Sequence, residues 1–172
     1  IMNRLVATVA LNRFLQHDSA SPSASHDVQT AASSSFPAQR LGSSGLFWVE
    51  GAIIGGQWHQ VGGSATRNYR AVRGEAVTLR GWAVDPQQRK PAQAVRVLID
   101  GRPGLVGPVN DYRPEVAETL KLTGANACGF KFALPTDGLS PGAHHVTFEA
   151  AAADGTGYYT VRPDLTLDIA AS

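Results

Sequence analysis

Cysteine, net charge and long apolar runs are all scarce in this chain, and each shortage excludes a class of protein. Cys128 is the single cysteine among 172 residues, so an internal disulfide is excluded. Lys and Arg together number 15 and Asp and Glu 14, which gives a net charge of +1. Because the basic residues are spread along the chain, we predict no nucleic-acid partner. No run of about 18 apolar residues is present, so we predict no membrane-spanning helix.

Motifs for nucleophilic, phosphate-binding and metal chemistry are also absent. There is no G-x-S-x-G motif, no glycine-rich phosphate loop after a strand, and no conspicuous carboxylate pair. Cys128 would need an adjacent base to act as a nucleophile, and His144 and His145 would point to opposite faces of a strand. We therefore predict no catalytic residue, no cofactor and no metal ligand. A small metal-dependent or Cys-dependent hydrolase stays as the third functional alternative.

Alternating apolar and polar residues are what the chain does contain. Period-two alternation predicts strands with one buried face, and such strands form antiparallel sheets. About eight short strands in about 125 residues match the size of an immunoglobulin-like domain. We predict an all-β fold, an antiparallel two-sheet Ig-like sandwich with one short helix and a flexible N-terminal extension. The inward-facing residues are Val95, Val97 and Ile99, Phe130, Phe132 and Leu134, Val146, Phe148 and Ala150, and Leu165, Leu167 and Ile169.

Turn residues divide the predicted strands. Gly55-Gly56, Asp100-Gly101 and Asp154-Gly155 are hairpin signals. Pro114, Glu115 and Lys121 suit a helix over residues 113–121, which would cross between the sheets. The polar segment 62–75 is predicted to be a connection. Strands are expected at 47–54, 57–61, 76–85, 94–100, 105–109, 128–134, 143–154, 157–161 and 165–170.

The first 45 residues differ from the rest in composition. Residues 1–16 repeat apolar residues at helical spacing and predict a short amphipathic helix, although Arg4 and the following LVATVAL faintly resemble a signal peptide. Residues 17–44 are rich in Ser and Ala and predict a flexible linker. We therefore predict two regions, an N-terminal extension over 1–45 and a β-sandwich domain over 46–172. The initial Ile before Met suggests a fragment of a larger protein or a cloning remnant.

Aromatic residues are the remaining candidates for binding. Trp82 breaks the alternation of its strand, and a bulge at Gly81 would turn it into the core. An exposed Trp82 that stacks on a sugar is the alternative. Sugars present CH-rich faces that stack on aromatic rings, and ordinary packing is the competing interpretation. The candidates for glycan contact are Trp48, Trp58, His59, Tyr158 and Tyr159.

Six segments, in this order, resemble a known kind of module. They are GWAVD (81–85), VLIDGRP (97–103), YRPEVA (112–117), CGFKFAL (128–134), LSPGAHHVTFEA (139–150) and DGTGYY (154–159). Over residues 72–169 the chain resembles Ig-like β-sandwich modules of bacterial cell-envelope proteins. Such modules are appended notably to membrane glycosyltransferases of the protein O-mannosyltransferase-like type.

The resemblance implies a location and a role. It implies an extracytoplasmic position, periplasmic or at the cell surface, with a tether to the membrane as one arrangement. The partner would be the membrane domain of the parent protein, another envelope protein or a glycan. We therefore expect a non-catalytic accessory module that positions a partner or contacts protein or glycan. A free-standing carbohydrate-binding module is the alternative.

Overall fold

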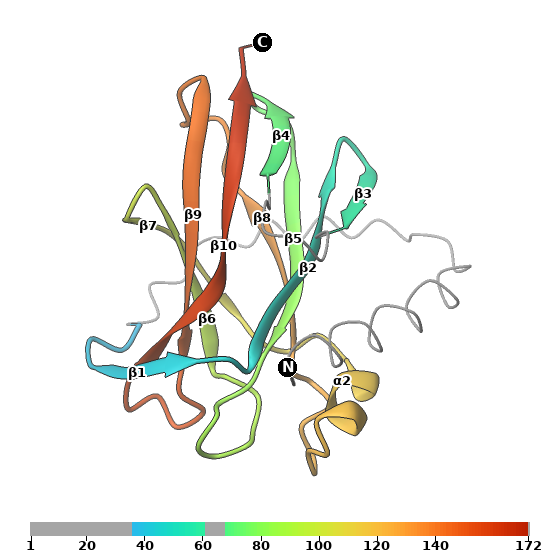
Figure 1. The fold of residues 1–172 in the computed structure, drawn as a ribbon, viewed down its shortest axis with the longest axis vertical. Coiled ribbons are helices and arrows are strands. Elements are labelled where there is room, and N and C mark those ends of the chain that lie inside the picture. The colour runs from blue at the N-terminus through green and yellow to red at the C-terminus, as the bar shows by residue number, and fades with distance from the viewer. Residues whose placement is uncertain (1–35, 61–67, 172) are drawn as a thin grey trace.

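The structure is a computed structural model that describes residues 36–60 and 68–171. Over these residues two β-sheets pack face to face as an Ig-like sandwich with one short helix (Figure 1), so the predicted fold class is confirmed. The predicted amphipathic helix over 1–16 and most of the predicted linker lie outside the described residues. No helix in the described part of the chain is long and apolar enough to cross a membrane.

Sheet A has the strand order β1-β10-β9-β6-β7, and β4 also pairs with β10. The strands β1 and β4 both run parallel to β10, β1 along residues 158–161 and β4 along residues 166–170. The other neighbours in this sheet are antiparallel. The strands of sheet A are β1 (Arg40–Ser44), β4 (Asn68–Val72), β6 (Ala94–Ile99), β7 (Arg102–Pro108), β9 (Gly142–Ala151) and β10 (Tyr158–Ala170).

Sheet B is fully antiparallel and has the strand order β3-β2-β5-β8. Its strands are β2 (Phe47–Ile54), β3 (Gln57–Gln60), β5 (Val77–Ala83) and β8 (Gly129–Leu134). Helix α2 (Pro114–Thr119) lies between β7 of sheet A and β8 of sheet B along the chain, so it crosses between the sheets as predicted. Pro114 is its first residue and Glu115 is in its first turn.

Two of the hairpins have two-residue loops in left-handed backbone conformation. Gly55 and Gly56 join β2 to β3 with φ values of 56° and 78°, and Asp100 and Gly101 join β6 to β7 with φ values of 52° and 74°. Positive φ at both central residues matches the twist of antiparallel strands, which is why Gly and Asp occupy these positions. The predicted hairpins at these turns are confirmed.

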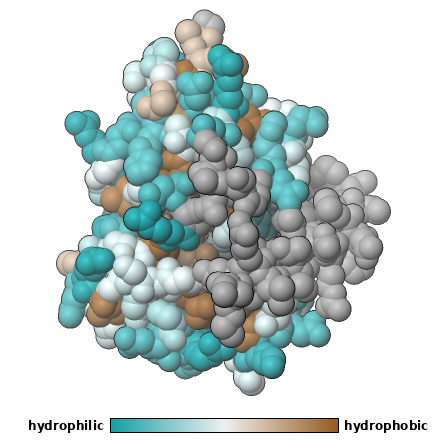
Figure 2. All heavy atoms as spheres, viewed as in Figure 1, coloured by the Kyte–Doolittle hydropathy of each residue, from teal (hydrophilic) through white to brown (hydrophobic). Residues whose placement is uncertain are grey.

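The main core lies between the inner faces of the two sheets. All of the inward-facing residues predicted from alternation are buried. Phe130 is central, since its ring stacks on Phe132 and Phe47 at centroid distances of 4.7 and 5.4 Å, and Phe47 also contacts Phe148 at 5.3 Å. On the outside, in the view of Figure 2, hydrophilic residues predominate and hydrophobic residues are scattered among them.

Three strands differ from the sequence prediction. Residues 40–44, predicted as the end of the linker, form β1, and residues 68–72, predicted as part of a polar connection, form β4. Both are short strands that pair with β10, far away in sequence, so local alternation gives little signal for them. The two strands predicted at 157–161 and 165–170 form one strand, β10, whose pairing with β9 is irregular between Val161 and Leu165.

Trp82 is buried, 3% exposed, but not for the predicted reason. The strand β5 has no bulge opposite β8, so Trp82 stays on the outer face of sheet B. There it belongs to what we call the second apolar cluster, whose buried members are Trp82, Val84, Val116, Ala117, Leu122, Ala125 and Cys128. The bulge is in β2, where the pairing with β5 shifts between Val49 and Gly51 around Glu50. This bulge changes which residues of β2 face the core, from Phe47 and Val49 before it to Ala52 and Ile54 after it.

Gly81 marks the place where β5 packs most closely on its neighbours. A Cβ atom there would meet the carbonyl oxygen of Trp48 and would lie 2.5 Å from Cζ of Phe130. We expect Gly81→Ala to lower the free energy of unfolding by about 1–3 kcal/mol, because the β2 backbone or the Phe130 ring must shift. Gly138→Ala is the matched control, since a Cβ there meets nothing within 4 Å. Urea unfolding of both variants checks this, and equal midpoints would contradict it.

Candidate functional site

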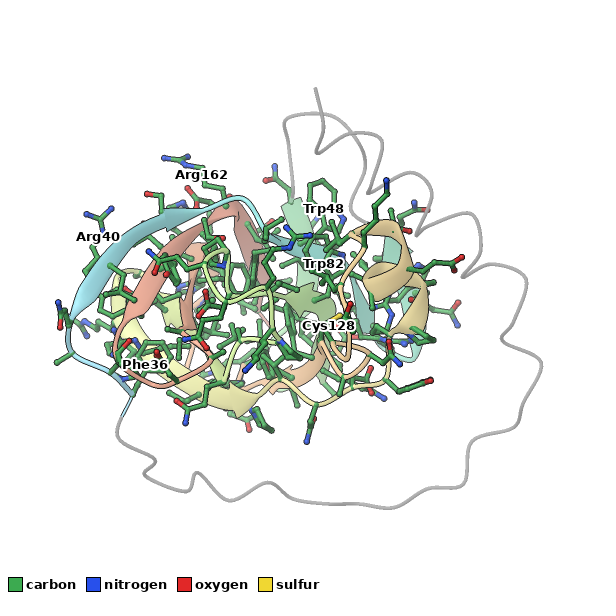
Figure 3. All side chains as sticks on the ribbon, turned by 90° about the horizontal axis from the view of Figure 1, so that it is seen from below. Phe36, Arg40, Trp48, Trp82, Cys128 and Arg162 are labelled. Atoms are coloured by element: carbon green, nitrogen blue, oxygen red, sulfur yellow. The ribbon has the colours of Figure 1, made fainter. Side chains whose placement is uncertain are left out.

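The five residues predicted to contact glycan do not form one site. Trp48 packs on the second apolar cluster, and Figure 3 shows it with Trp82 on the side of α2. Trp58 and His59 are on the edge strand β3. Tyr159 is a core residue, only 4% exposed, so its ring cannot face a ligand. Tyr158, the next residue, lies on the outer face of sheet A.

Trp58 is half-buried because it covers a glycine. A Cβ atom on Gly51 would lie 2.7 Å from Cζ2 of Trp58, so the indole lies directly over the β2 backbone. His59 beside it is exposed. Ile53, opposite Trp58 in the β2–β3 hairpin, is also half-buried. Trp58 thus packs on the outer face of sheet B, and its role in glycan contact stays a prediction.

An aromatic and cationic cluster occupies the outer face of sheet A. The Arg96 guanidinium lies 4.2 Å from the ring centroid of Phe36 and 5.4 Å from that of Tyr158. The two rings are 5.8 Å apart and tilted by 49°. Arg96 is fixed by Glu149, which accepts its Nε–H at 2.6 Å and lies opposite it in the sheet. We call Phe36, Arg96, Glu149 and Tyr158 the sheet A cluster. Phe36 and Arg96 were not among the predicted candidates.

Arg40 lies on the same face beside this cluster. Its Nη2 donates to Oγ1 of Thr160 at 3.2 Å and to Oγ of Ser43 at 3.4 Å. The two hydroxyl oxygens are 3.2 Å apart. Figure 3 shows Phe36 and Arg40 toward the end of the sandwich opposite α2. Because the predicted linker included Arg40 and Ser43, sequence reasoning could not place them on this face.

A buried charge cluster connects α2 to sheet B. Arg113 occupies the N-cap position of α2, and its guanidinium donates to both carboxylate oxygens of Glu50, with Nη1 and Oε2 at 2.7 Å. Its Nε donates to Glu115. The side chains of Arg113 and Glu50 are 4% and 5% exposed. Although burial alone would lower the pKa of Arg113, its hydrogen bonds to Glu50 and then Glu115 outweigh that effect and raise it, so the guanidinium stays charged.

Cys128 contacts Arg113 of this charge cluster. It also belongs to the second apolar cluster, together with Trp82. It is fully buried, and its Sγ contacts the carbonyl oxygen of Arg113 at 3.9 Å. Burial raises the pKa of the Cys128 thiol to about 11, so the thiol is protonated at neutral pH. A protonated, buried thiol is a poor nucleophile, because the thiolate is the reactive form.

His144 and His145 point to opposite sides of β9, as predicted. His144 is 7% exposed, with Nδ1 2.7 Å from Oδ2 of Asp100 and Nε2 2.7 Å from the carbonyl oxygen of Ser140. His145 is exposed, and its Nε2 is 3.6 Å from Oδ2 of Asp164. In the described part of the chain, His, Cys, Asp and Glu side chains form no group of three that could hold a metal ion.

The environment of His144 favours its charged form. Two oxygen acceptors flank the ring, so both nitrogens donate when the imidazole is protonated. The hydrogen bonds to Ser140 and then Asp100 raise the pKa of His144. The bonds from His144 and then from the backbone N–H of His145 lower the pKa of Asp100. The pair holds the β6–β7 turn against β9.

Glu50→Gln tests the buried charge cluster. We expect it to lower the free energy of unfolding by about 3–5 kcal/mol, since a buried guanidinium loses its main counter-charge. The matched control is Asp168→Asn, which removes an exposed pair with Arg70 at 3.8 Å and should cost at most about 1 kcal/mol. Replacing both partners, Glu50→Leu with Arg113→Met, should recover much of the loss. Chemical denaturation measures all three, and a Glu50→Gln loss no larger than that of Asp168→Asn would contradict the cluster's role.

Asp100→Asn tests the His144 pair through pH. Because the pKa of His144 is raised on folding, its contribution is fully present below its ordinary pKa of 6.5 and is lost as pH rises through the folded value. The contribution of Asp100 is lost only as pH falls through its own lowered pKa. We therefore expect the stability difference between the natural protein and Asp100→Asn to be larger near about pH 5.5 than near about pH 8.5. Denaturation at the two pH values measures it, and a difference that grows toward high pH would refute the assignment.

Comparison with known proteins gives no family for this chain. No family model matches it, and no curated protein matches it. Among solved structures, it is similar to the fibronectin(III)-like modules of Clostridium thermocellum CbhA, with 12% identity and a TM-score of 0.37 over 64% of this chain and 94% of that one. It is also similar to a Jonesia denitrificans lytic polysaccharide monooxygenase, with 11% identity and a TM-score of 0.35 over 64% of this chain and 60% of that one.

Proposed function

We propose that the chain is a non-catalytic β-sandwich accessory module of a larger bacterial cell-envelope protein, located on the extracytoplasmic side. The main support is that the groups with potential reactivity have structural partners. The Cys128 thiol is buried and protonated, and His144 is bound at both ring nitrogens. Arg113 is bound by two carboxylates. These side chains stabilise the sandwich, which is what a positioning module requires.

The resemblance of residues 72–169 to modules appended to membrane glycosyltransferases supports a finer proposal. In this proposal the parent protein carries the catalytic centre in its membrane domain, and the sandwich positions that domain or its substrate. Three of the segments that carry the resemblance have structural roles here. Asp85 of GWAVD accepts backbone N–H groups from Gln87, Gln88 and Ala153, so it holds the loop after β5 against the β9–β10 turn. Asp100 and Arg113 hold the turn and the helix described above.

A free-standing carbohydrate-binding module is the second candidate. One observation favours it, namely the half-buried Tyr158 ring on the outer face of sheet A, with Arg40 opposite Tyr158 in the pairing of β1 with β10. An aromatic ring next to hydrogen-bond donors is the usual composition of a sugar-binding surface. The two candidates are compatible, because an accessory module can also contact glycan.

Cell fractionation with an antibody against the sandwich tests the primary proposal. In the source bacterium we expect the antibody to detect a protein larger than the 18.1 kDa of this chain, in the membrane fraction. Protease added to intact cells or spheroplasts should cleave it, because the module would face outward. The control is a cytoplasmic protein that resists the protease until lysis. Detection of a soluble product protected from protease in intact spheroplasts would overturn the proposal.

A further inference from the structure

The outer face of sheet A contains two arginines, Arg40 and Arg96, in different environments. Among the described residues, Arg40 has no carboxylate oxygen within 4.0 Å, and its side-chain bonds go to the hydroxyls of Thr160 and Ser43. Arg96, on the same face, is neutralised by Glu149 at 2.5 Å. A guanidinium has five N–H donors in a planar fork, and within the described residues Arg40 uses only Nη2, at 3.2 and 3.4 Å, so the other donors of its fork are available to a ligand there.

Strand register places these groups in one row. Arg96 lies opposite Glu149, Glu149 lies opposite Thr160, and Thr160 lies opposite Ser43 across four strands of sheet A. In the neighbouring row Tyr158 lies opposite Arg40. The pairing of the strands therefore places Arg40 and the two hydroxyls in the row of Tyr158 and the row beside it.

The sheet A cluster holds the Tyr158 ring in place. Arg96 contacts both rings and is itself fixed by Glu149, so Phe36, Arg96 and Tyr158 support one another. The backbone N–H of Tyr158 donates to the carbonyl oxygen of Gln39 at 2.8 Å, which ties the strand to the segment that carries Phe36 and Arg40. A ring fixed in this way loses little conformational entropy when a ligand binds.

We propose that this face, formed by Arg40, Ser43, Thr160 and Tyr158, binds an acidic glycan that contains uronic-acid residues. The sugar carboxylate would accept two hydrogen bonds from the Arg40 fork, and the sugar hydroxyls would bond with Thr160 and Ser43. The apolar face of the sugar ring would lie against Tyr158. The inference rests on the proposed extracytoplasmic position, where the module can meet such a polymer.

The charge distribution favours an acidic glycan over a nucleic acid. A nucleic acid presents closely spaced phosphates and is bound by many cations at once. This chain has a net charge of +1, and Arg96 is already paired. One guanidinium bonded to two hydroxyls, with one aromatic residue in the neighbouring row, instead matches a sugar that has one carboxylate and several hydroxyl groups.

Binding of polygalacturonate to the purified 172-residue chain tests the proposal. Isothermal titration should show binding to polygalacturonate and at least about tenfold weaker binding to the same polymer with its carboxylates methyl-esterified. Arg40→Gln should weaken polygalacturonate binding by at least about tenfold, whereas Arg40→Lys, which keeps the charge, should lose less. Arg162→Gln is the matched control, because Arg162 is 88% exposed and pairs with Asp164 at 3.6 Å. It should bind like the natural protein. Thermal unfolding confirms that each variant is folded.

Three results would overturn the inference. They are no binding by the natural protein, an equal loss in Arg40→Gln and Arg162→Gln, or binding of polyglutamate as tight as that of polygalacturonate. The third would indicate an acidic protein segment as the ligand. Each of these results leaves the proposed accessory function intact, because that function is tested separately by fractionation and protease access.

Discussion

The contact between Arg113 and Glu50 constrains the rest of the sandwich. The Arg113 side chain, only 4% exposed, is stable inside the protein because two carboxylates accept its hydrogen bonds. The geometry of that contact requires Glu50 to point away from the main core, which the bulge in β2 allows. It also requires Gly129, since a Cβ there would lie 2.5 Å from Cγ of Arg113. One ion pair thus fixes the relative positions of β2, the start of α2 and the first residue of β8.

The two sheets differ on their outer faces. Sheet B is covered on its inner face by sheet A and, at the end nearest α2, on its outer face by the second apolar cluster that contains Trp82 and Cys128. Sheet A has its apolar residues on the inner face, and its outer face has ion pairs, hydroxyls and the Tyr158 ring. Trp82 therefore packs inside the protein, while the half-buried Tyr158 ring lies on the outer face of sheet A.

Local patterns in the sequence predict the inner faces, the two-residue hairpins and the helix, because each depends on residues close together in the chain. They do not predict which distant strands pair, so the sequence predicts a linker where β1 lies and a polar connection where β4 lies. The alternation of buried Tyr69 and Ala71 within β4 was a usable signal, although five residues long. Glu50, a carboxylate inside the apolar stretch FWVEGAII, marks the bulge in β2, whereas the sequence predicts the bulge at Gly81 in β5.

Local patterns in the sequence predict the candidate site even less well than the strand pairing. Tyr158 and Tyr159 are neighbours in sequence, but a strand turns them to opposite faces, and one is a core residue. The residues that surround Tyr158 come from the segment before β1, from β6 and from β9. A shift of one residue in the pairing of β1 would turn Arg40 and Ser43 inward and Leu41 outward, and Leu41 packs on the main core. Burial of Leu41 thus selects the register that presents Arg40 beside Tyr158, so the stability of the sandwich and the composition of its outer face have one physical cause.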